Sequence, residues 1–496
     1  MMRIKQHLYG VGLVALLASQ ATWAAWDQQP NHYHVTIAND GKRAHIKADV
    51  YVEGNELALF GVNTLPTLKN GQGDFLENIV VQDMAGKPVA VTDKGEAEYV
   101  VADGDRRLAL TYEVRLDHSK YDWPGGVEEV LYHTDEGIMA VGNSLFLVPG
   151  VAMPGNTEVS FTLPPGWKAQ TPWLAGSKPG SFVAETRREL VNNAMFLGTA
   201  HSERFMAGGV ELTLVMGKRY WPQKALFMDL MRRQLASYQT LFGGPPRTNR
   251  YLVVINDGDV SDGGAFAGSF SQIIKGEADT SSRVIWGRIV AHELLHFWNG
   301  HTLVPAEPGD EWFKEGVTDY LTLVTLVRNQ VMDRKFLINN LENLPRGQGV
   351  ARKLMGLKST VREAVNDKHG NWLLVYGGGT IAALAMDVEL RKASRGKVGM
   401  SLLMQSVYAE FGQSGKRYTQ ADIVRHGRKL AGLDLQPTLE RIVNSTALVE
   451  MEPLFADIGL RLHQFGMLET HLLPDPKATP EARRRFADIF GVPLQH

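Results

Sequence analysis

The segment VAHELLHFWNGH holds two histidines four residues apart, with a glutamate directly after the first. These residues are His292, Glu293 and His296, and the apolar residues around them recur at three- and four-residue steps. The recurrence predicts a helix that ends near Gly300, and on it the two histidines share one face. Two such imidazoles can bind one zinc ion, and the glutamate can reach a water in the open coordination position as a general base. The same pattern also occurs by chance in buried helices, so the pair alone does not distinguish chemistry from packing.

A third metal ligand is available in the next predicted helix, GDEWFKEGVTDYLTLVTLVRNQ. Glu315 lies in its first turns, and residues 297–314 are enough for a loop and an antiparallel return to His296. Two histidines, one glutamate and a water form the open coordination of catalytic zinc, so we expect His292, His296 and Glu315 to hold Zn²⁺. Asp319 follows Glu315 by four residues on the same face and is predicted to accept a hydrogen bond from a ligand histidine. The alternative for Asp319 is an ordinary exposed helix carboxylate.

The composition limits both the partners and the ligand chemistry of the chain. Its 496 residues are 44% hydrophobic and 21% charged, which is typical of a globular protein with more than one core. The 52 lysines and arginines nearly balance the 54 aspartates and glutamates, so no nucleic-acid partner is predicted. Because the chain has no cysteine, nitrogen and oxygen must hold any bound metal, and no disulfide can stabilise the fold.

The first residues have the order of a secretory signal. Arg3 and Lys5 precede an apolar stretch, residues 8–18, and small residues follow up to Ala24. We therefore expect residues 1–24 to be a signal peptide and the mature protein to be exported, to the periplasm or outside the cell. The apolar stretch is shorter than the roughly 20 residues of a membrane span, so no stable membrane insertion is expected after cleavage.

Two kinds of element must position these groups. Over residues 26–216, apolar and polar residues alternate in short runs separated by turn residues, which predicts an N-terminal antiparallel, β-sandwich-like domain. Over residues 217–450 the spacing is mostly helical, and this part carries the histidine and glutamate motifs. Residues 451–496 are predicted to form a helical tail, with a capped helix in TPEARRRFADIFG. The predicted fold class is therefore multidomain α+β.

Three segments resemble the glycyl aminopeptidase family of the gluzincin zinc metallopeptidases: HELLHFWN, EWFKEGVTDY and YGGGTIAALAMDVELR. The family continues its zinc helix with Trp-Asn, as here with Trp298 and Asn299, and its glutamate ligand lies in Trp-x-x-Glu-Gly, as Glu315 does here. The resemblance implies a thermolysin-like, mostly helical catalytic domain, peptide substrates and a catalytic role for Tyr376. In the family, the matching tyrosine donates a hydrogen bond to the oxyanion of the tetrahedral intermediate.

The chain departs from the family where the substrate is bound. The family carries Gly-Gly-x-Glu after a strand, and this glutamate grips the free α-amine of the substrate. Here Gly263 and Gly264 are present and are expected to bind substrate backbone as an added strand, but Phe266 occupies the place of the glutamate. An aminopeptidase-like zinc peptidase is the favoured function. An endopeptidase, or a peptidase acting on amine-blocked substrates, is the alternative that Phe266 suggests.

Other departures leave further alternatives open. Asp257, Asp259 or Asp262 could supply the missing charge, although each could equally be a solvated loop residue. The family's basic run after Trp-Asn is replaced by GHTLVP, and too few residues follow EPLFADIGLRL for the family's C-terminal PDZ domain. A catalytically silent zinc-containing binding protein is the alternative of another class. Glu293 argues against it, because a structural zinc site needs no general base.

Overall fold

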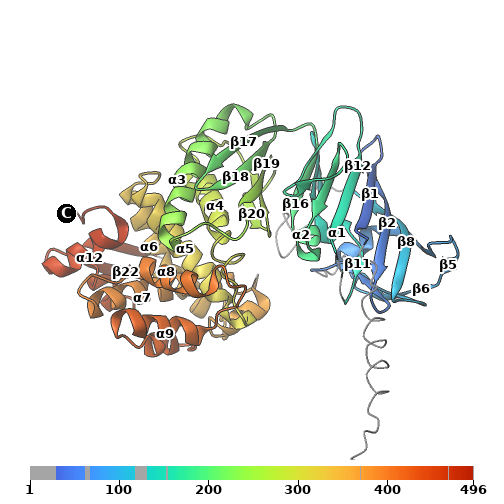
Figure 1. Cartoon of the computed structure of the whole chain (residues 1–496). Helices are drawn as coiled ribbons and strands as arrows, with labels where there is room; N and C mark the ends of the chain where they lie inside the picture. Colours follow the sequence, from blue (N-terminus) through green and yellow to red (C-terminus); the bar gives the residue numbers. More distant parts are fainter. Residues whose placement is uncertain are drawn as a thin grey trace, which may run out of the picture. The chain divides into compact units, whose positions relative to one another are not determined.

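The computed structural model describes residues 29–61, 68–117, 131–151, 153, 155–368, 370–466 and 469–494. The predicted signal peptide, residues 1–24, lies outside the described residues. The chain forms two compact units (Figure 1). The first consists of Met1–Asp117, Gly142–Pro165 and Trp173–Val191, and the second of His118–Val141, Gly166–Pro172 and Asn192–His496.

Two β-sheets build the first unit. The larger sheet has the spatial order β14 (Leu174–Ala175), β15 (Ser181–Ala184), β12 (Thr157–Thr162), β1 (Asn31–Ile37), β2 (Arg43–Val52), β8 (Arg106–Arg115), β4 (Leu76–Asp83) and β5 (Pro88–Val89). The smaller sheet has the order β11 (Val148–Pro149), β3 (Glu56–Ala58), β7 (Glu98–Val101) and β6 (Val91–Gly95). The central strand β2 buries every second residue, as the alternating sequence predicts.

One pairing in the first unit departs from the predicted antiparallel arrangement. Strand β1 pairs antiparallel with β2 but parallel with β12. A tight hairpin can join only antiparallel strands, so two parallel strands need a longer connection. Here β1 and β12 pair Asn31 with Thr157, and more than a hundred residues separate the two strands in the sequence. The alternating pattern predicts a strand and its buried face, but it does not predict the direction of the neighbouring strand.

Two further sheets belong to the second unit. One has the order β13 (Lys168–Gln170), β16 (Ala194–Gly198), β10 (Gly137–Val141) and β9 (Tyr132–Thr134). The other has the order β17 (His201–Ala207), β18 (Val210–Met216), β19 (Arg250–Asp257), β21 (Ser269–Ile274) and β20 (Asp262–Ala265). Strands β17 and β18 fall in the range predicted for the N-terminal domain, but they share a sheet with β19 to β21. The second unit therefore includes residues 192–216.

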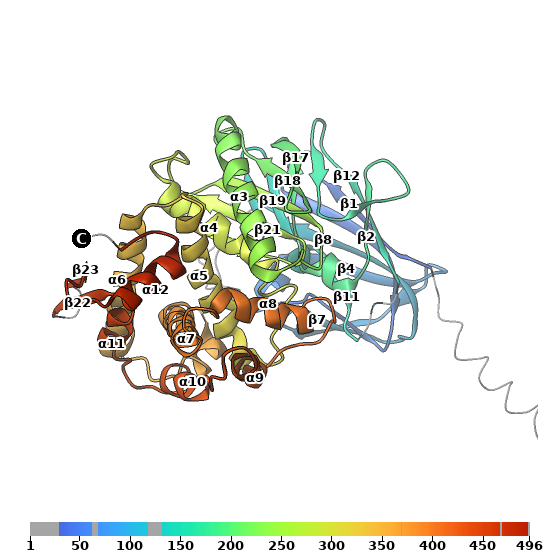
Figure 2. The ribbon, with the colours of Figure 1, turned by 60° about the vertical axis from the view of Figure 1, so that its left-hand side comes forward.

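Helices form most of the rest of the second unit (Figure 2). In chain order they are α3 (Lys224–Phe242), α4 (Arg283–His296), α5 (Glu311–Arg328), α6 (Arg334–Gly349), α7 (Gly379–Ala393), α8 (Met400–Phe411), α9 (Gln420–Ala431) and α10 (Gln436–Ile442). Helix α7 lies among these helices and contacts α5, α8, α9 and α10. A π-helical segment, Leu373–Gly378, leads into α7. The stretch Leu373–Ala393 is long and apolar enough to cross a membrane, but 72% of its apolar window is buried inside the protein, as in a core helix.

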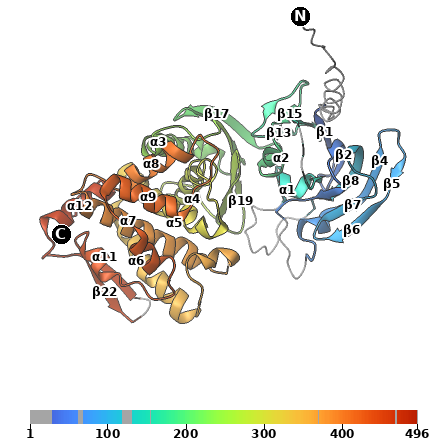
Figure 3. The same cartoon turned by 60° about the horizontal axis from the view of Figure 1, so that its bottom comes forward.

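The last part of the second unit differs from the predicted helical tail. Helices α11 (Glu452–Ala456) and α12 (Pro480–Phe490) flank a hairpin of β22 (Leu460–Phe465) and β23 (Glu469–Pro474) (Figure 3). The strand sequences LRLHQF and ETHLLP contain alternating apolar and polar residues, a period that favours strands over helices. Helix α12 is capped as predicted. The Thr479 side chain accepts a hydrogen bond from the Ala482 N–H, and Gly491 ends the helix in a left-handed conformation.

Candidate active site

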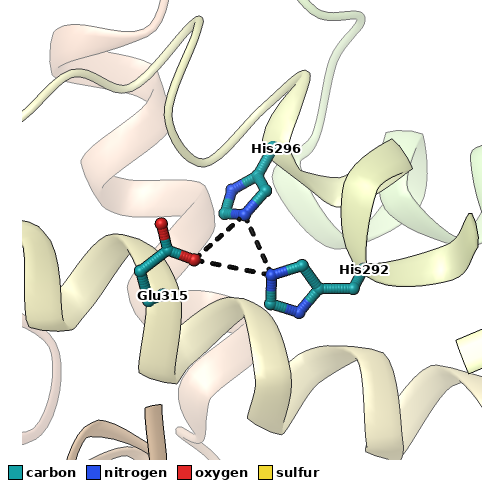
Figure 4. Close-up of side chains that lie close together, drawn as sticks. All are labelled: His292, His296 and Glu315. Atoms are coloured by element: carbon teal, nitrogen blue, oxygen red, sulfur yellow. Dashed lines mark hydrogen bonds and ion pairs between the residues drawn. The ribbon is translucent and has the colours of Figure 1, made fainter. Parts of the chain in front are cut away.

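Three buried side chains converge between α4 and α5 (Figure 4). His292 and His296 come from the last turns of α4, and Glu315 comes from the second turn of α5. The two Nε2 atoms are 3.0 Å apart. Oε2 of Glu315 is 3.2 Å from Nε2 of His296 and 3.5 Å from Nε2 of His292. The three residues therefore meet as their spacing in the sequence predicts.

Hydrogen bonds on the far side of each imidazole determine which nitrogen carries the proton. Nδ1 of His296 lies 2.9 Å from the carbonyl oxygen of Asn299, which can only accept, so this nitrogen donates. Nδ1 of His292 lies 3.0 Å from Oδ1 of Asp319, and an ionised carboxylate also only accepts. In the neutral rings both Nε2 atoms then present lone pairs to each other. A cation between them relieves this repulsion.

The arrangement fits a tetrahedral zinc ion. Ligand atoms at the usual distances of about 2.0–2.1 Å from zinc lie about 3.3 Å from each other, close to the three separations observed here. Oε2 of Glu315 is buried and makes no hydrogen bond to the described residues. A buried carboxylate oxygen without a donor is expected where a metal supplies the positive charge. Two imidazoles and one carboxylate are also the donor set of catalytic zinc sites with an open position.

Two lysines contact the other oxygen of Glu315. Nζ of Lys368 lies 2.6 Å from Oε1, and Nζ of Lys314 lies 3.4 Å from it. Burial alone would raise the pKa of Glu315, but Lys368, His296 and Lys314 hold it well below its usual value. Glu315 is therefore ionised, and its Oε2 is left for a metal. Neither lysine is among the residues predicted from the sequence. Lys314 could have been found as the neighbour of Glu315, but Lys368 lies 53 residues away in a loop without a motif.

Asp319 lies where the sequence predicts, beside His292, and Arg288 holds it there. Nη2 of Arg288 is 3.2 Å from the Oδ1 atom that accepts from His292. Burial would raise the pKa of Asp319, but Arg288 and His292 lower it to about 2. Burial likewise would lower the pKa of His292, but the neighbouring carboxylates of Asp319 and Glu315 raise it to about 10. The surroundings of His292 thus favour a positive charge at this point.

Asn299 joins the end of α4 to the start of α5. Its Nδ2 donates to the carbonyl oxygens of Phe313 and Lys314, each at 3.1 Å, and lies 3.2 Å from Oγ1 of Thr318. The carbonyl of Asn299 fixes His296, so this one residue positions both helices that carry metal ligands. The family motif identified Asn299 in the sequence, but only the structure gives it this role.

A close approach of α5 and α7 places Glu315 beside Tyr376. A Cβ atom on Gly316 would lie 2.2 Å from Cα of Gly379, so both positions require glycine. Tyr376 lies on the π-helical segment just before α7, with its ring centroid 6.0 Å from that of His292. Burial, reinforced by the charges of Glu315 and other carboxylates, raises the pKa of Tyr376 well above its usual value. Its hydroxyl therefore stays protonated and can donate a hydrogen bond.

His292, Asp319 and Tyr376 line a cleft of about 430 Å³. Its walls consist of Asp262, Gly263, Val284, Ile285, Arg288, Ile289, His292, Glu293, Asp319, Trp372 and Tyr376. Strand β20 packs closely against α4, because a Cβ atom on Gly263 would lie 2.7 Å from Cγ2 of Ile289 and 3.6 Å from Cγ of Glu293. The bare backbone of β20 thus forms one wall of the cleft next to Glu293.

Phe266 does not line this cleft, contrary to its predicted place in the substrate site. Its side chain is only 7% exposed and packs in a buried cluster with Tyr132, Val254 and Ile273. The reason is local. Strand β20 ends before Phe266, whose N–H donates to the carbonyl of Ser269 in the turn to β21, and the ring points into the core. Gly264 lies in β20 but is not among the lining residues.

Two family models match the sequence. The Peptidase M61 N-terminal domain matches residues 68–199, and M61 glycyl aminopeptidase matches residues 286–373. The second match contains the three converging side chains as well as Glu293 and Asp319. Among curated proteins, no sequence matches the chain.

Solved structures with a similar fold include an aminopeptidase N family protein and a zinc metallopeptidase. An aminopeptidase N family protein from Idiomarina loihiensis has a TM-score of 0.74 and 18% identity, over 88% of this chain and 79% of that one. An M1 zinc metallopeptidase from Deinococcus radiodurans has a TM-score of 0.56 and 16% identity, over 86% of this chain and 95% of that one. These likenesses confirm the predicted fold class, a sheet-rich N-terminal domain followed by a mostly helical one.

Proposed function

We propose that the chain is a metallopeptidase that uses zinc to remove residues from the amino end of peptides, since M61 peptidase models match residues 68–199 and 286–373. The observation that carries the proposal is the convergence of His292, His296 and Glu315, because His292 also lines a cleft with Glu293 and Tyr376. Three protein ligands leave a fourth position for water, as a catalytic zinc site requires, and His292 joins these ligands to the cleft.

The residues of the cleft have separate tasks in the proposed reaction. When bound, zinc polarises the scissile carbonyl and acidifies the attacking water. Glu293, which lines the cleft beside His292, takes the proton of that water and passes it to the leaving amine. Tyr376 remains protonated, so its hydroxyl can donate to the carbonyl oxygen as negative charge develops there. Asp319 fixes the orientation of His292 through their hydrogen bond.

Strand β20 offers a binding edge for the substrate backbone. It is the last strand of the five-stranded sheet, and Asp262 and Gly263 line the cleft. An extended peptide can add to such an edge through main-chain hydrogen bonds. The close approach of Gly263 to Glu293 would bring the peptide backbone next to the general base.

The position of Phe266 favours the aminopeptidase over the alternatives. Because its ring is buried in the core, it gives no reason to expect amine-blocked substrates. Asp262 instead places a carboxylate on the cleft wall, where it can pair with the ammonium group of a free amino terminus. Glu293 lines the same cleft, and a silent binding protein would have no use for it.

The test uses the purified protein loaded with zinc and pairs of peptides that differ only in a free or acetylated amino terminus. We expect release of single amino-terminal residues from the free peptides, no cleavage of the acetylated ones, and loss of activity on chelation. Internal cleavage of acetylated peptides would replace the aminopeptidase with an endopeptidase. Zinc binding without any turnover would support the silent binding protein.

We also propose that the protein acts after export, on the basis of the secretory pattern in residues 1–24. Mass spectrometry of the protein from fractionated cells should find an exported form that begins near residue 25. An unprocessed chain confined to the cytoplasm would contradict the proposal.

A further inference from the structure

Part of the cleft wall is apolar and exposed to water. Val284, Ile285 and Trp372 line it, with exposed fractions of 46%, 55% and 54%. Single exposed apolar residues are normal on protein surfaces, but three large ones lining one cleft mark a binding surface. We call these three residues the apolar rim.

Helix α4 connects the apolar rim to the reacting groups. Ile285, Ile289 and Glu293 follow one another at steps of four residues, so they share one face of α4, and all three line the cleft. A helix rises 1.5 Å per residue, so Ile285 lies about 12 Å along the axis from Glu293. An extended peptide rises about 3.3 Å per residue, so this distance corresponds to between three and four substrate residues.

The π-helical segment before α7 also carries an exposed apolar residue near a reacting group. Trp372 and Tyr376 are four residues apart there, and both line the cleft. An exposed indole ring therefore lies about one turn from the catalytic hydroxyl. Two segments far apart in the sequence thus each present an exposed apolar side chain and a reacting group to the same cleft.

The charged residues on the cleft wall do not favour an acidic side chain in the substrate. Arg288 lies one turn from the apolar rim, but its Nη2 is 3.2 Å from Oδ1 of Asp319, so its charge is already paired. Asp262 adds a negative charge to the wall. At the apolar rim, a substrate side chain can therefore contact only aliphatic and aromatic groups.

We propose that the apolar rim binds a large aliphatic or aromatic side chain of the substrate, three to four residues beyond the bond that is cut. The inference rests on the proposed function, because a peptide cut after its first residue can reach the rim only with later residues. This side chain is then the fourth or fifth residue of the peptide. Its burial against Ile285 and Trp372 removes apolar surface from water on both partners.

The experiment uses hexapeptides of alanine and serine that carry one leucine or phenylalanine at each position from two to six. For the zinc-loaded protein we expect the highest kcat/KM when the apolar residue stands at position four or five. Trp372→Ala should reduce the preference for phenylalanine over alanine there by about tenfold, because apolar contacts of this size discriminate by roughly 10–200-fold. Cleavage of the all-alanine peptide should change much less. Leu402→Ala removes an exposed apolar side chain of α8 outside the cleft and is the matched control.

A second measurement separates failure of this inference from failure of the proposed function. Calorimetric titration of the Glu293→Gln protein with the same peptides reports binding even where nothing is cut. Tighter binding of the peptides with phenylalanine at position four or five, lost in the Trp372→Ala double variant, supports the apolar rim. An apolar preference that is absent, or that persists unchanged without Trp372, overturns it.

Discussion

Helix α4 and strand β20 both line the catalytic cleft, but they contribute different chemistry. Helix α4 supplies side chains, and a residue outside the helix holds each of its two imidazoles. Asp319 of α5 fixes His292, and the carbonyl of Asn299 fixes His296. Strand β20 supplies bare backbone at Gly263 and one carboxylate at Asp262, and the sheet itself holds it in place. We infer that the α4 wall determines whether a bond is cut, and that the β20 wall determines which peptide is presented.

The largest effect should follow a change on the α4 wall. Glu293→Gln removes the general base but keeps the shape of the side chain, so kcat should fall by about 10²–10⁴-fold. Zinc content, measured by atomic absorption, should remain the same, because Glu293 is not among the converging ligands. If Glu293→Gln turned over peptides about as fast as the unchanged protein, the α4 wall would not be the part of the cleft that performs the chemistry.

The next largest effect should come from the contact between α5 and α7, which places Glu315 beside Tyr376. In Gly316→Ala the new Cβ would collide with the backbone of α7 at Gly379, and backbone cannot move aside cheaply. The free energy of unfolding should fall by about 1–3 kcal/mol or more, with weaker zinc binding, because Glu315 is the adjacent residue. Gly347→Ala is the matched control. There the nearest atom to the new Cβ is a side-chain methyl of Leu373 at 3.6 Å, an ordinary contact.

Equal stability of the two glycine variants in urea denaturation would contradict this account. The comparison is informative because both substitutions raise helix propensity by the same chemical change. Only the distance to neighbouring atoms differs between the two sites. A loss of zinc affinity in Gly316→Ala without a loss of stability would place the effect at the metal ligands alone.

The helical part of the site could be predicted from the sequence because the helix period determines which side chains point to the same side of a helix. Once His292 and His296 share a face, and Glu315 and Asp319 share another, a single antiparallel turn brings all four together. The partners that come from elsewhere could not be predicted. Lys368 reaches Glu315 from a loop, and no local pattern encodes that contact.

The strands were harder to predict for a related reason. Phe266 was placed in the substrate site by the family resemblance, which gives its position in the chain but not the direction of its side chain. Strand β20 ends at Ala265, and the ring of Phe266 is buried in the core. Alternation also does not say which sheet a strand joins. For this reason the strands of residues 201–216 were predicted in the N-terminal domain but pair within the second unit.

On the β20 wall, Asp262→Asn should change substrate preference more than rate. We expect KM for free-amine peptides to rise by roughly fivefold, because partly exposed ion pairs contribute up to about 1 kcal/mol. The kcat value should stay nearly constant. Asp259→Asn changes a loop aspartate that does not line the cleft and should leave both constants unchanged. A large fall in kcat for Asp262→Asn would show that the β20 wall takes part in the chemistry.

The smallest effect should appear where α4 begins, at the end of the helix that carries the apolar rim. The carboxylate of Asp279 accepts hydrogen bonds from the N–H of Ser282 and the hydroxyl of Ser281, which lowers its pKa from 3.8 to about 2. A lowered folded-state pKa means that the stabilisation is complete well above pH 3.8 and is lost as pH falls toward 2. Asp279→Ala should therefore lower Tm slightly at pH 7, and the difference from the unchanged protein should shrink between pH 4 and the acid limit. Glu277→Ala removes an exposed carboxylate two residues earlier and serves as the control. If affinity for peptides with an apolar fourth or fifth residue falls in Asp279→Ala while kcat holds, the outer turns of α4 serve recognition and its inner turns serve chemistry.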